Sequence, residues 1–556
     1  MRTRLLCILA LASCAGPDRA SAPAAASATA TPAATATATA TAASAPAASR
    51  TSSSRPTAET REGRVLGKLD GDGVAAFLGV PYAAPPVAGD RWREALPPRP
   101  HPPLEATAFR LPCSQIPLPQ AGDRFSTGKK IPSSEDCLHL NVWVPPRAAG
   151  EKLPVMAWLH GGQYLRGAAS QYDGAQLART GHVIVVTMDY RLGPLGFLAH
   201  PALTRESPRH TSGNEALFDS LQALVWLRAN IAAFGGDPGR LTLFGESAGS
   251  ASTCALLASP LARGLFQRAI MESDACPGAE DTPSLASREE FGRRLADALG
   301  CKSSDLGREL ACMRSKTADQ VLTAIPLAKV LGDDGNGVGY RFNKDNVMLS
   351  ESPEEALKAG RIMRVPVMLG TTDDEMGRYV VGLDIHSADD FRARIAKEWP
   401  EHARLLVDTY PVSHDVGDQV AALYSDWGMT CPVRRDARWF SSAGVPTYLY
   451  RFTHAPNVMG GKAGAFHGSE LVYLFPSVFA RPDLHLVYGD QDRALARLMI
   501  GYWARFAATG DPNGEGALAW PRYTSATDRH MTIDLAPSIG HHLRGAQCDT
   551  WDRVGD

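Results

Sequence analysis

A Gly-x-Ser-x-Gly motif constrains the fold of this chain more than any other feature. It is formed by Gly245, Glu246, Ser247, Ala248 and Gly249. Residues 240–244 before it are typical of a strand, and residues 248–257 after it are typical of a helix. In that setting the motif predicts a nucleophile elbow, a sharp turn that lifts a serine Oγ above a sheet. The alternative is a glycine-rich loop with a structural serine, and the flanking strand and helix argue against it.

Strand and helix patterns alternate around this motif. Residues 182–189 form an apolar run typical of a strand buried on both faces of a parallel sheet. Residues 214–234 carry apolar side chains at helical spacing, and residues 280–353 are predicted to be a helical insertion. Further strands are predicted at 138–144, 155–159, 268–272, 365–370 and 447–453. The alternation predicts an α/β fold with a mostly parallel central sheet flanked by helices.

The N-terminal residues have a different composition from the rest. Arg2 and Arg4 precede a short apolar run, 5–12, which is typical of a signal peptide. The end of the run together with Ser13 and Cys14 resembles the bacterial lipoprotein signal, with a plain secretory signal as the alternative. The following residues are almost all Ala, Thr, Ser and Pro, which predicts a disordered tether. The predicted organisation is a signal peptide at 1–13, a tether at 14–60 and one folded domain at 61–556.

Charge and hydropathy argue against nucleic-acid binding and against a transmembrane helix. The 57 basic and 59 acidic residues give a net charge of −2, so there is no basic footprint for nucleic acid. No run of about 20 apolar residues is present, so no transmembrane helix is expected. We expect a monomer exported to the periplasm or the cell surface, with a membrane contact only through lipidated Cys14, or otherwise secreted.

Several longer motifs resemble the type-B carboxylesterase family, which includes the cholinesterases and has the α/β-hydrolase fold. Residues 234–250 are similar to the family's serine signature, and residues 135–143 are similar to its second signature. Residues 190–197 and 213–219 also resemble family motifs, and the likeness extends from about residue 63 to residue 551. The resemblance implies a serine carboxylic ester hydrolase that acts through an acyl-enzyme on Ser247 and needs no metal or organic cofactor.

A serine nucleophile needs a base, and in this fold the base follows the acid in the chain. His467 comes late in the chain and is followed by Gly468, Ser469 and Glu470. This context resembles the family's His-Gly-x-Glu motif and implies that His467 is the catalytic base. The alternatives are His454, His541 and His542.

The acid is expected after the predicted strand at 365–370. The family carries Glu in an Asp-Glu-Gly context, which falls on Glu375, although Met376 stands where the family has Gly. The neighbouring Asp373 and Asp374 are the alternatives.

The segment His160-Gly161-Gly162-Gln163 resembles the family's His-Gly-Gly-Gly loop. The resemblance implies an oxyanion hole made by the backbone N–H groups of Gly162, Gln163 and Ala248. A simple tight turn is the alternative. Gln163 replaces the usual Gly, which a backbone donor tolerates if the φ angle is allowed.

Cysteine usage fits an exported protein. Of ten cysteines, Cys7 and Cys14 fall in the signal, and the rest show no zinc-ligand spacing, so disulfides are favoured over metal. Spacing alone does not pair them. The family resemblance implies the pairs Cys113–Cys137, Cys301–Cys312 and Cys431–Cys548. The resemblance leaves Cys254 and Cys276 unassigned, and buried thiols are the simplest expectation for them.

The loop between Cys113 and Cys137 bears on the substrate. In cholinesterases it supplies a Trp on which a quaternary ammonium stacks. Residues 114–136 contain no Trp, Phe125 is their only aromatic residue, and Lys129 and Lys130 add positive charge. A neutral or anionic ester is therefore expected rather than a choline ester.

The sequence leaves two other functions open. One is a relative that keeps the fold but acts by binding or adhesion, which an intact Ser247, Glu375 and His467 argue against. The other is an amidase or polyester hydrolase that would use the same three residues.

Overall fold

The computed structural model describes residues 55–116, 131–326, 329–330, 339–380, 382–412, 415–457, 464–479 and 486–555. The predicted signal peptide, Cys14 and most of the predicted tether lie outside these residues, as do Phe125, Lys129 and Lys130. Within the described part of the chain, no helix is both long and apolar enough to cross a membrane.

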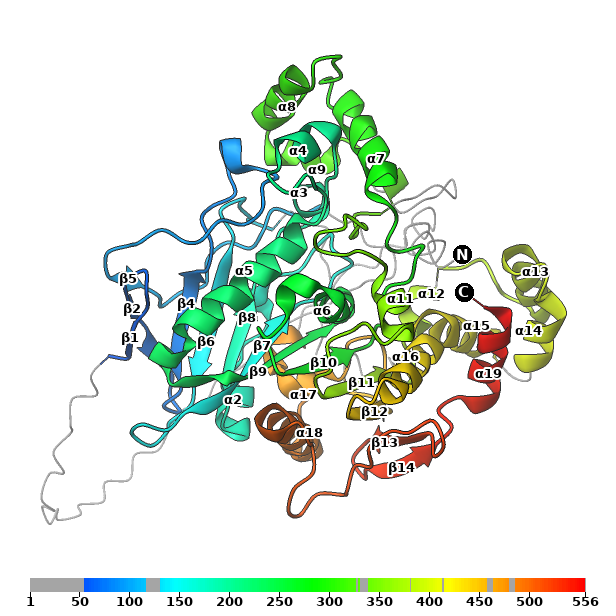
Figure 1. The fold of residues 1–556 in the computed structure, drawn as a ribbon. Helices are drawn as coiled ribbons and strands as arrows, with labels where there is room; N and C mark the ends of the chain where they lie inside the picture. Colours follow the sequence, from blue (N-terminus) through cyan, green and yellow to red (C-terminus); the bar gives the residue numbers. More distant parts are fainter. Residues whose placement is uncertain are drawn as a thin grey trace, which may run out of the picture.

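A large twisted sheet forms the centre of the molecule (Figure 1). Within the described residues it has 11 strands in the order β14-β13-β12-β11-β10-β9-β7-β8-β6-β4-β3. The run from β8 through β13 is parallel, and the strands at both ends are antiparallel. The prediction of a mostly parallel α/β sheet is confirmed. The strands are β3 (Lys68–Leu69), β4 (Ala75–Pro81), β6 (His139–Val144), β7 (Leu153–Leu159), β8 (Ile184–Met188), β9 (Gly236–Glu246), β10 (Arg268–Glu272), β11 (Val367–Thr372), β12 (Thr447–Phe452), β13 (Arg529–Ile533) and β14 (Ser538–His541).

Two apolar cores lie on opposite faces of this sheet. Because successive strand side chains point to opposite faces, Ala157 of β7 enters one core and its neighbour Trp158 enters the other. Helices α5 (Glu215–Asn230) and α6 (Ala248–Ala258) pack into the first core. Helices α2 (Ala175–Gly181), α17 (Leu471–Leu474) and α18 (Asp490–Thr509) pack into the second. Burial on both faces explains why the central strands are apolar throughout.

The predicted helical insertion lies at one end of the molecule, at the top of Figure 1. It contains α7 (Leu285–Ala298), α8 (Leu306–Ser315) and α9 (Ala318–Thr323). Helix α8 packs against α4 (Pro201–Glu206), and α9 packs against α3 (Gly193–Gly196).

A third apolar cluster, here called the satellite core, lies beside the C-terminal half of the sheet. It is built on α12 (Gly377–Val380), α13 (Ala388–Glu398), α14 (Ala403–Thr409), α15 (Val416–Ser425), the π-helical turn Asp426–Thr430 and α19 (Gly545–Val554). Its aromatic centre is made by Trp399, Trp427 and Trp551, whose rings meet edge to face. Met376, the residue after the predicted acid, belongs to this cluster.

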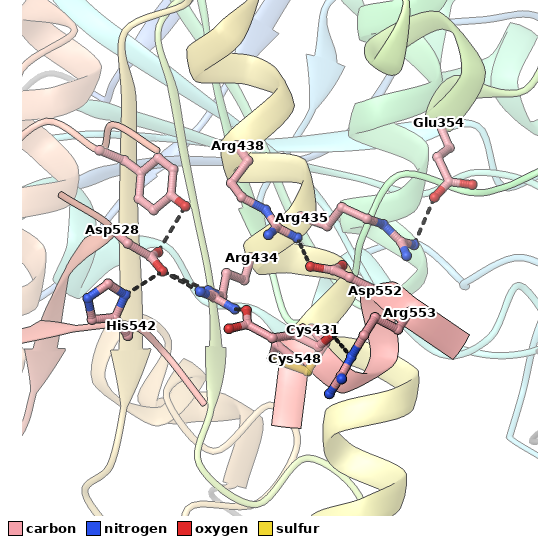
Figure 2. Close-up of polar contacts among 12 residues, drawn as sticks. Glu354, Cys431, Arg434, Arg435, Arg438, Asp528, His542, Cys548, Asp552 and Arg553 are labelled. Carbon is pink, nitrogen blue, oxygen red and sulfur yellow. Dashed lines mark hydrogen bonds and ion pairs between the residues drawn. A yellow bond between two sulfur atoms is a disulfide. The ribbon is translucent and has the colours of Figure 1, made fainter. Parts of the chain in front are cut away.

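The C-terminal helix α19 is fastened to α16 (Cys431–Ser442), as Figure 2 shows. The disulfide Cys431–Cys548 joins the two helices. Ion pairs Arg434–Asp549 and Arg438–Asp552 run between them on the same side. Arg434 also binds Asp528, just before β13, and Arg435 binds Glu354 of α11 (Pro353–Lys358). Helix α16 is thereby held to α19, to the sheet and to α11.

The folded part begins earlier than the predicted residue 61. Strand β1 (Thr57–Glu59) pairs with β2 (Arg64–Leu66), which pairs in turn with β5 (Leu104–Glu105), and Arg55 forms an ion pair with Glu105. The predicted boundary of the tether is therefore too late. Residues 55–60 include Pro, Thr and Ala, so composition did not separate them from the tether.

Within the described residues the structure has four disulfides. Three join Cys113 to Cys137, Cys301 to Cys312 and Cys431 to Cys548. The fourth joins Cys254 to Cys276, so the expectation of buried thiols there is wrong. Cys254 lies on α6 and Cys276 follows β10, and the close packing of helix on strand brings their Cα atoms to 5.3 Å.

Candidate active site

Ser247 lies in the turn from β9 to α6, as the motif predicts. Its backbone has φ 55° and ψ −124°, a strained conformation for a residue other than glycine. The Ser247 N–H donates to the carbonyl oxygen of Glu272 on β10 at 2.9 Å. A Cβ atom on Gly249 would collide with the carbonyl of Leu159. The motif glycine is therefore needed for the close approach of α6 to the sheet.

Glu375 and His467 meet beside this end of the sheet. Glu375 follows β11, and His467 lies in the turn before α17. His467 Nδ1 is 2.6 Å from Glu375 Oε2, while Glu375 Oε1 accepts the N–H of Thr372 at 2.7 Å. Glu375 is fully buried. Both carboxylate oxygens are thus occupied, which fixes the direction of the bond to the imidazole.

The two neighbouring acids point elsewhere. Asp373 forms an ion pair with Arg451 of β12, and Asp374 accepts the N–H of Gly377 at 2.9 Å. Burial raises the pKa of Asp374 to about 6. Among these consecutive acids, Glu375 is the one that contacts His467.

The alternative histidines have other partners. His454 Nδ1 lies 3.1 Å from Asp534, and His542 Nδ1 lies 3.3 Å from Asp528. His541 ends β14, an edge strand of the sheet.

Glu246, the residue before the serine, was not given a role from the sequence, although the motif contains it. Its Oε1 lies 3.1 Å from His467 Nε2, the nitrogen that does not face Glu375. Burial raises the pKa of Glu246 to about 7. Burial alone would lower the pKa of His467, but Glu246, Tyr379 and the bond to Glu375 outweigh it and raise that pKa well above its usual value.

The segment 160–163 packs directly against the elbow. A Cβ atom on Gly161 would come within 2.5 Å of Glu246 Oε2 and 3.1 Å of Ser247 Cβ. The φ angles of Gly162 and Gln163 are 110° and 59°. Gln163 therefore has a left-handed backbone conformation, which is unfavourable for residues other than glycine. The N–H groups of Gly162 and Gln163 donate to no other protein group within the described residues, which leaves them free for a ligand oxygen.

Two tyrosines hold this segment in place. The Tyr164 hydroxyl donates to the carbonyl of Ala248 at 2.8 Å, which ties the segment to the first residue of α6. The Tyr190 hydroxyl donates to the carbonyl of His160 at 2.6 Å. Burial lowers the pKa of His160 to about 4, so its ring stacks on Tyr190 in the neutral form.

The chain is similar to known proteins over most of its length. The profile described as Carboxylesterase family matches residues 54–551. The chain belongs to the carboxylesterase family. It is 33% identical to carboxylesterase 5A of Canis lupus familiaris over 542 residues, 90% of this chain and 89% of that protein. It is 35% identical to fumonisin B1 esterase of Sphingopyxis macrogoltabida over 491 residues, 86% of each chain.

A solved structure extends the likeness to the fold. The structure titled PNB esterase matches with a TM-score of 0.74 and 32% identity, over 89% of this chain and 99% of that one. The present protein is therefore a carboxylic ester hydrolase with the α/β-hydrolase fold. Within its described residues, no group of three or more His, Cys, Asp or Glu side chains is arranged to hold a metal ion.

Two further buried acids of this carboxylesterase lie behind the serine. Glu272 accepts the indole N–H of Trp503 at 2.8 Å, and burial raises its pKa to about 8. Glu470 accepts the hydroxyl of Ser273 at 3.1 Å, and burial also raises its pKa well above the usual range. Glu272 is therefore largely neutral near pH 7.

We expect Glu246→Gln to move the acid limb of the kcat/KM profile to lower pH. With His467 as general base, activity needs the neutral imidazole, and a carboxylate beside it stabilises the protonated form and raises its pKa. Removing that charge lowers the pKa of His467, so the ring stays neutral at lower pH. The measurement is kcat/KM between about pH 5 and pH 9 with an ester that does not ionise.

Glu272→Gln is the matched control. It replaces a buried carboxyl group that is already largely neutral and that binds Trp503 rather than His467. Its acid limb should coincide with that of the unsubstituted enzyme. If the acid limb of Glu246→Gln stays in place or moves to higher pH, Glu246 does not raise the pKa of a His467 general base.

Proposed function

We propose that this carboxylesterase cleaves esters through an acyl-enzyme on Ser247. His467 acts as general base and then as general acid, and Glu375 orients its ring and stabilises the imidazolium. The observation that carries the proposal is the 2.6 Å bond between Glu375 and His467 Nδ1, which leaves Nε2 on the side of the elbow.

The first half of the reaction is acylation. His467 Nε2 exchanges Glu246 Oε1 for Ser247 Oγ and takes its proton as Oγ attacks the ester carbonyl. The oxyanion that forms accepts hydrogen bonds from the N–H groups of Gly162, Gln163 and Ala248. The imidazolium then protonates the leaving alkoxide, and the alcohol departs.

The second half returns the enzyme to its starting state. Water attacks the acyl group, His467 takes the proton of that water, and Ser247 Oγ leaves with the proton that His467 returns. No step needs a metal or a cofactor, because the serine supplies the nucleophile and backbone N–H groups stabilise the oxyanion that forms on the ester carbonyl.

Ser247→Ala should lower kcat by roughly 10⁶, because triad members act as a unit. The test is the hydrolysis rate of a nitrophenyl ester by purified, folded protein. An organophosphate should add one label to the unsubstituted enzyme, on the peptide that contains Ser247, and none to the variant. A label on another serine, or a variant within tenfold of the original rate, would show that Ser247 is not the nucleophile.

We also propose that the substrate is a neutral ester rather than a choline ester. The support is the sequence between Cys113 and Cys137, which has no Trp to receive a quaternary ammonium. A choline ester should therefore have about the same kcat/KM as a matched ester with a tert-butyl group in place of the trimethylammonium group. A preference for the cation above about 2 kcal/mol, the scale of a desolvated cation–π contact, would contradict the proposal.

The four disulfides indicate folding in an oxidising compartment outside the cytoplasm. We propose in addition that Cys14 is lipidated and anchors the protein at the membrane through the Ala/Thr/Ser/Pro tether. Cys14→Ser should then move the protein from the membrane fraction to the soluble fraction after cell lysis. If mass spectrometry shows that the unsubstituted protein carries no lipid, the result supports plain secretion instead.

A further inference from the structure

The residue after the triad acid departs from the family pattern, and the structure gives it two partners. Met376 stands where the family has Gly, and its side chain is 2% exposed within the satellite core. Its N–H donates to the hydroxyl of Ser425 at 2.9 Å. Its carbonyl oxygen accepts the N–H groups of Tyr379 at 2.9 Å and Val380 at 3.0 Å, which starts α12. The backbone on both sides of Met376 is thus held by the satellite core.

Ser425 is itself held firmly. It is the last residue of α15 and is 2% exposed. The next residue, Asp426, is buried, and its carboxylate accepts the guanidinium of Arg544 and the hydroxyl of Tyr410 at 2.9 Å. Arg544 directly precedes α19, the helix that the disulfide and ion pairs of Figure 2 fasten to α16. The Ser425 hydroxyl is therefore presented from a rigid support.

Met376 lies in the chain between two residues that contact His467, namely Glu375 and Tyr379. On one side Glu375 reaches His467 Nδ1 and is steadied by the Thr372 N–H. On the other side α12 carries Tyr379, whose ring meets the His467 ring edge to face at 5.8 Å. A shift of Met376 would therefore move the acid and the aromatic neighbour of the imidazole together.

We propose that Ser425 is a positioning residue for the triad acid: its hydroxyl holds the Met376 N–H and so aims Glu375 at His467. The inference rests on the function proposed above, in which Glu375 is the acid. The bond fixes the backbone of Met376 at the position where the family has a glycine. In the proposed reaction Glu375 touches His467 and not the ester, so a carboxylate displaced by part of an ångström should lower kcat rather than change KM.

The first test is Ser425→Ala. We expect kcat to fall by about 10- to 100-fold, the scale of losing a positioning contact, while KM changes by less than about twofold. The matched control is Ser441→Ala, on α16, which removes a hydroxyl that donates to the carbonyl of Tyr523 at 3.3 Å. It should leave both constants unchanged. Unfolding in urea, measured on each variant, shows that the compared proteins are folded.

The second test is a double-mutant cycle with Glu375→Gln, which alone should lower kcat by roughly 10⁴. If Ser425 acts through the acid, Ser425→Ala should cost less than about twofold more in the Glu375→Gln background. If the two losses in kcat multiply in full in the double variant, Ser425 acts by another route and the inference is overturned. If Glu375→Gln alone stays fully active, the acid of the proposed function is wrong. A large loss in Glu375→Gln beside a normal Ser425→Ala rejects only the positioning role.

A second substitution covers the case in which Ser425→Ala does not fold. Ser425→Cys keeps nearly the same size and offers a thiol, a weak acceptor. It should lower kcat by at least about threefold with KM unchanged, and a normal kcat in the folded variant would overturn the inference.

Discussion

The buried hydrogen bond between Glu375 and His467 is the interaction on which the arrangement of this enzyme depends. Its partners come from segments 92 residues apart, which meet because β11 and β12 are parallel neighbours. Parallel strands bring their carboxyl ends to one edge of a sheet, and ligands of open α/β folds bind at that edge. β9 ends at the same edge, since Glu246 pairs in register with Glu272, and Glu272 pairs with Gly370. The sheet topology therefore assembles serine, acid and histidine before any side chain is considered.

Local patterns were enough to predict most of that sheet. The strand predicted at 268–272 is β10 (Arg268–Glu272), and the helix predicted at 248–257 is α6 (Ala248–Ala258). The strand predicted at 365–370 ends too early, because Thr371 and Thr372 continue the pairing of β11 with β12. The prediction stopped at Gly370. In the structure Gly370 pairs with Glu272 of β10 and with Tyr450 of β12, so the strand continues through the glycine. The antiparallel outer strands, by contrast, were not distinguished from the parallel ones, because strand direction is set by connections and not by local composition.

The features that sequence reasoning missed are contacts through space. The Cys254–Cys276 disulfide depends on how α6 lies against β10, and residue spacing carries no such information. Glu246 stands inside the predicted motif, yet its contact with His467 requires the turn before α17 to fold back over the elbow. Met376 looked like a departure that put the acid in doubt. In the folded chain its side chain fills the satellite core while its N–H reaches Ser425, so the substitution brings its own support.

The electrostatics of the site follow from burying several carboxyl groups in one place. Glu246, Glu272 and Glu470 all have raised pKa values, because each is removed from water and lies near other acids. A raised pKa favours the neutral form of a carboxyl group, which limits the repulsion within the cluster. Glu375 differs in its partners, since it meets the imidazole on one oxygen and a backbone N–H on the other. Acids that lie in different environments can take different roles in catalysis. The contact with the imidazole is thus made by Glu375, while Glu272, whose carbonyl accepts the Ser247 N–H, has a pKa of about 8 and is largely neutral near pH 7.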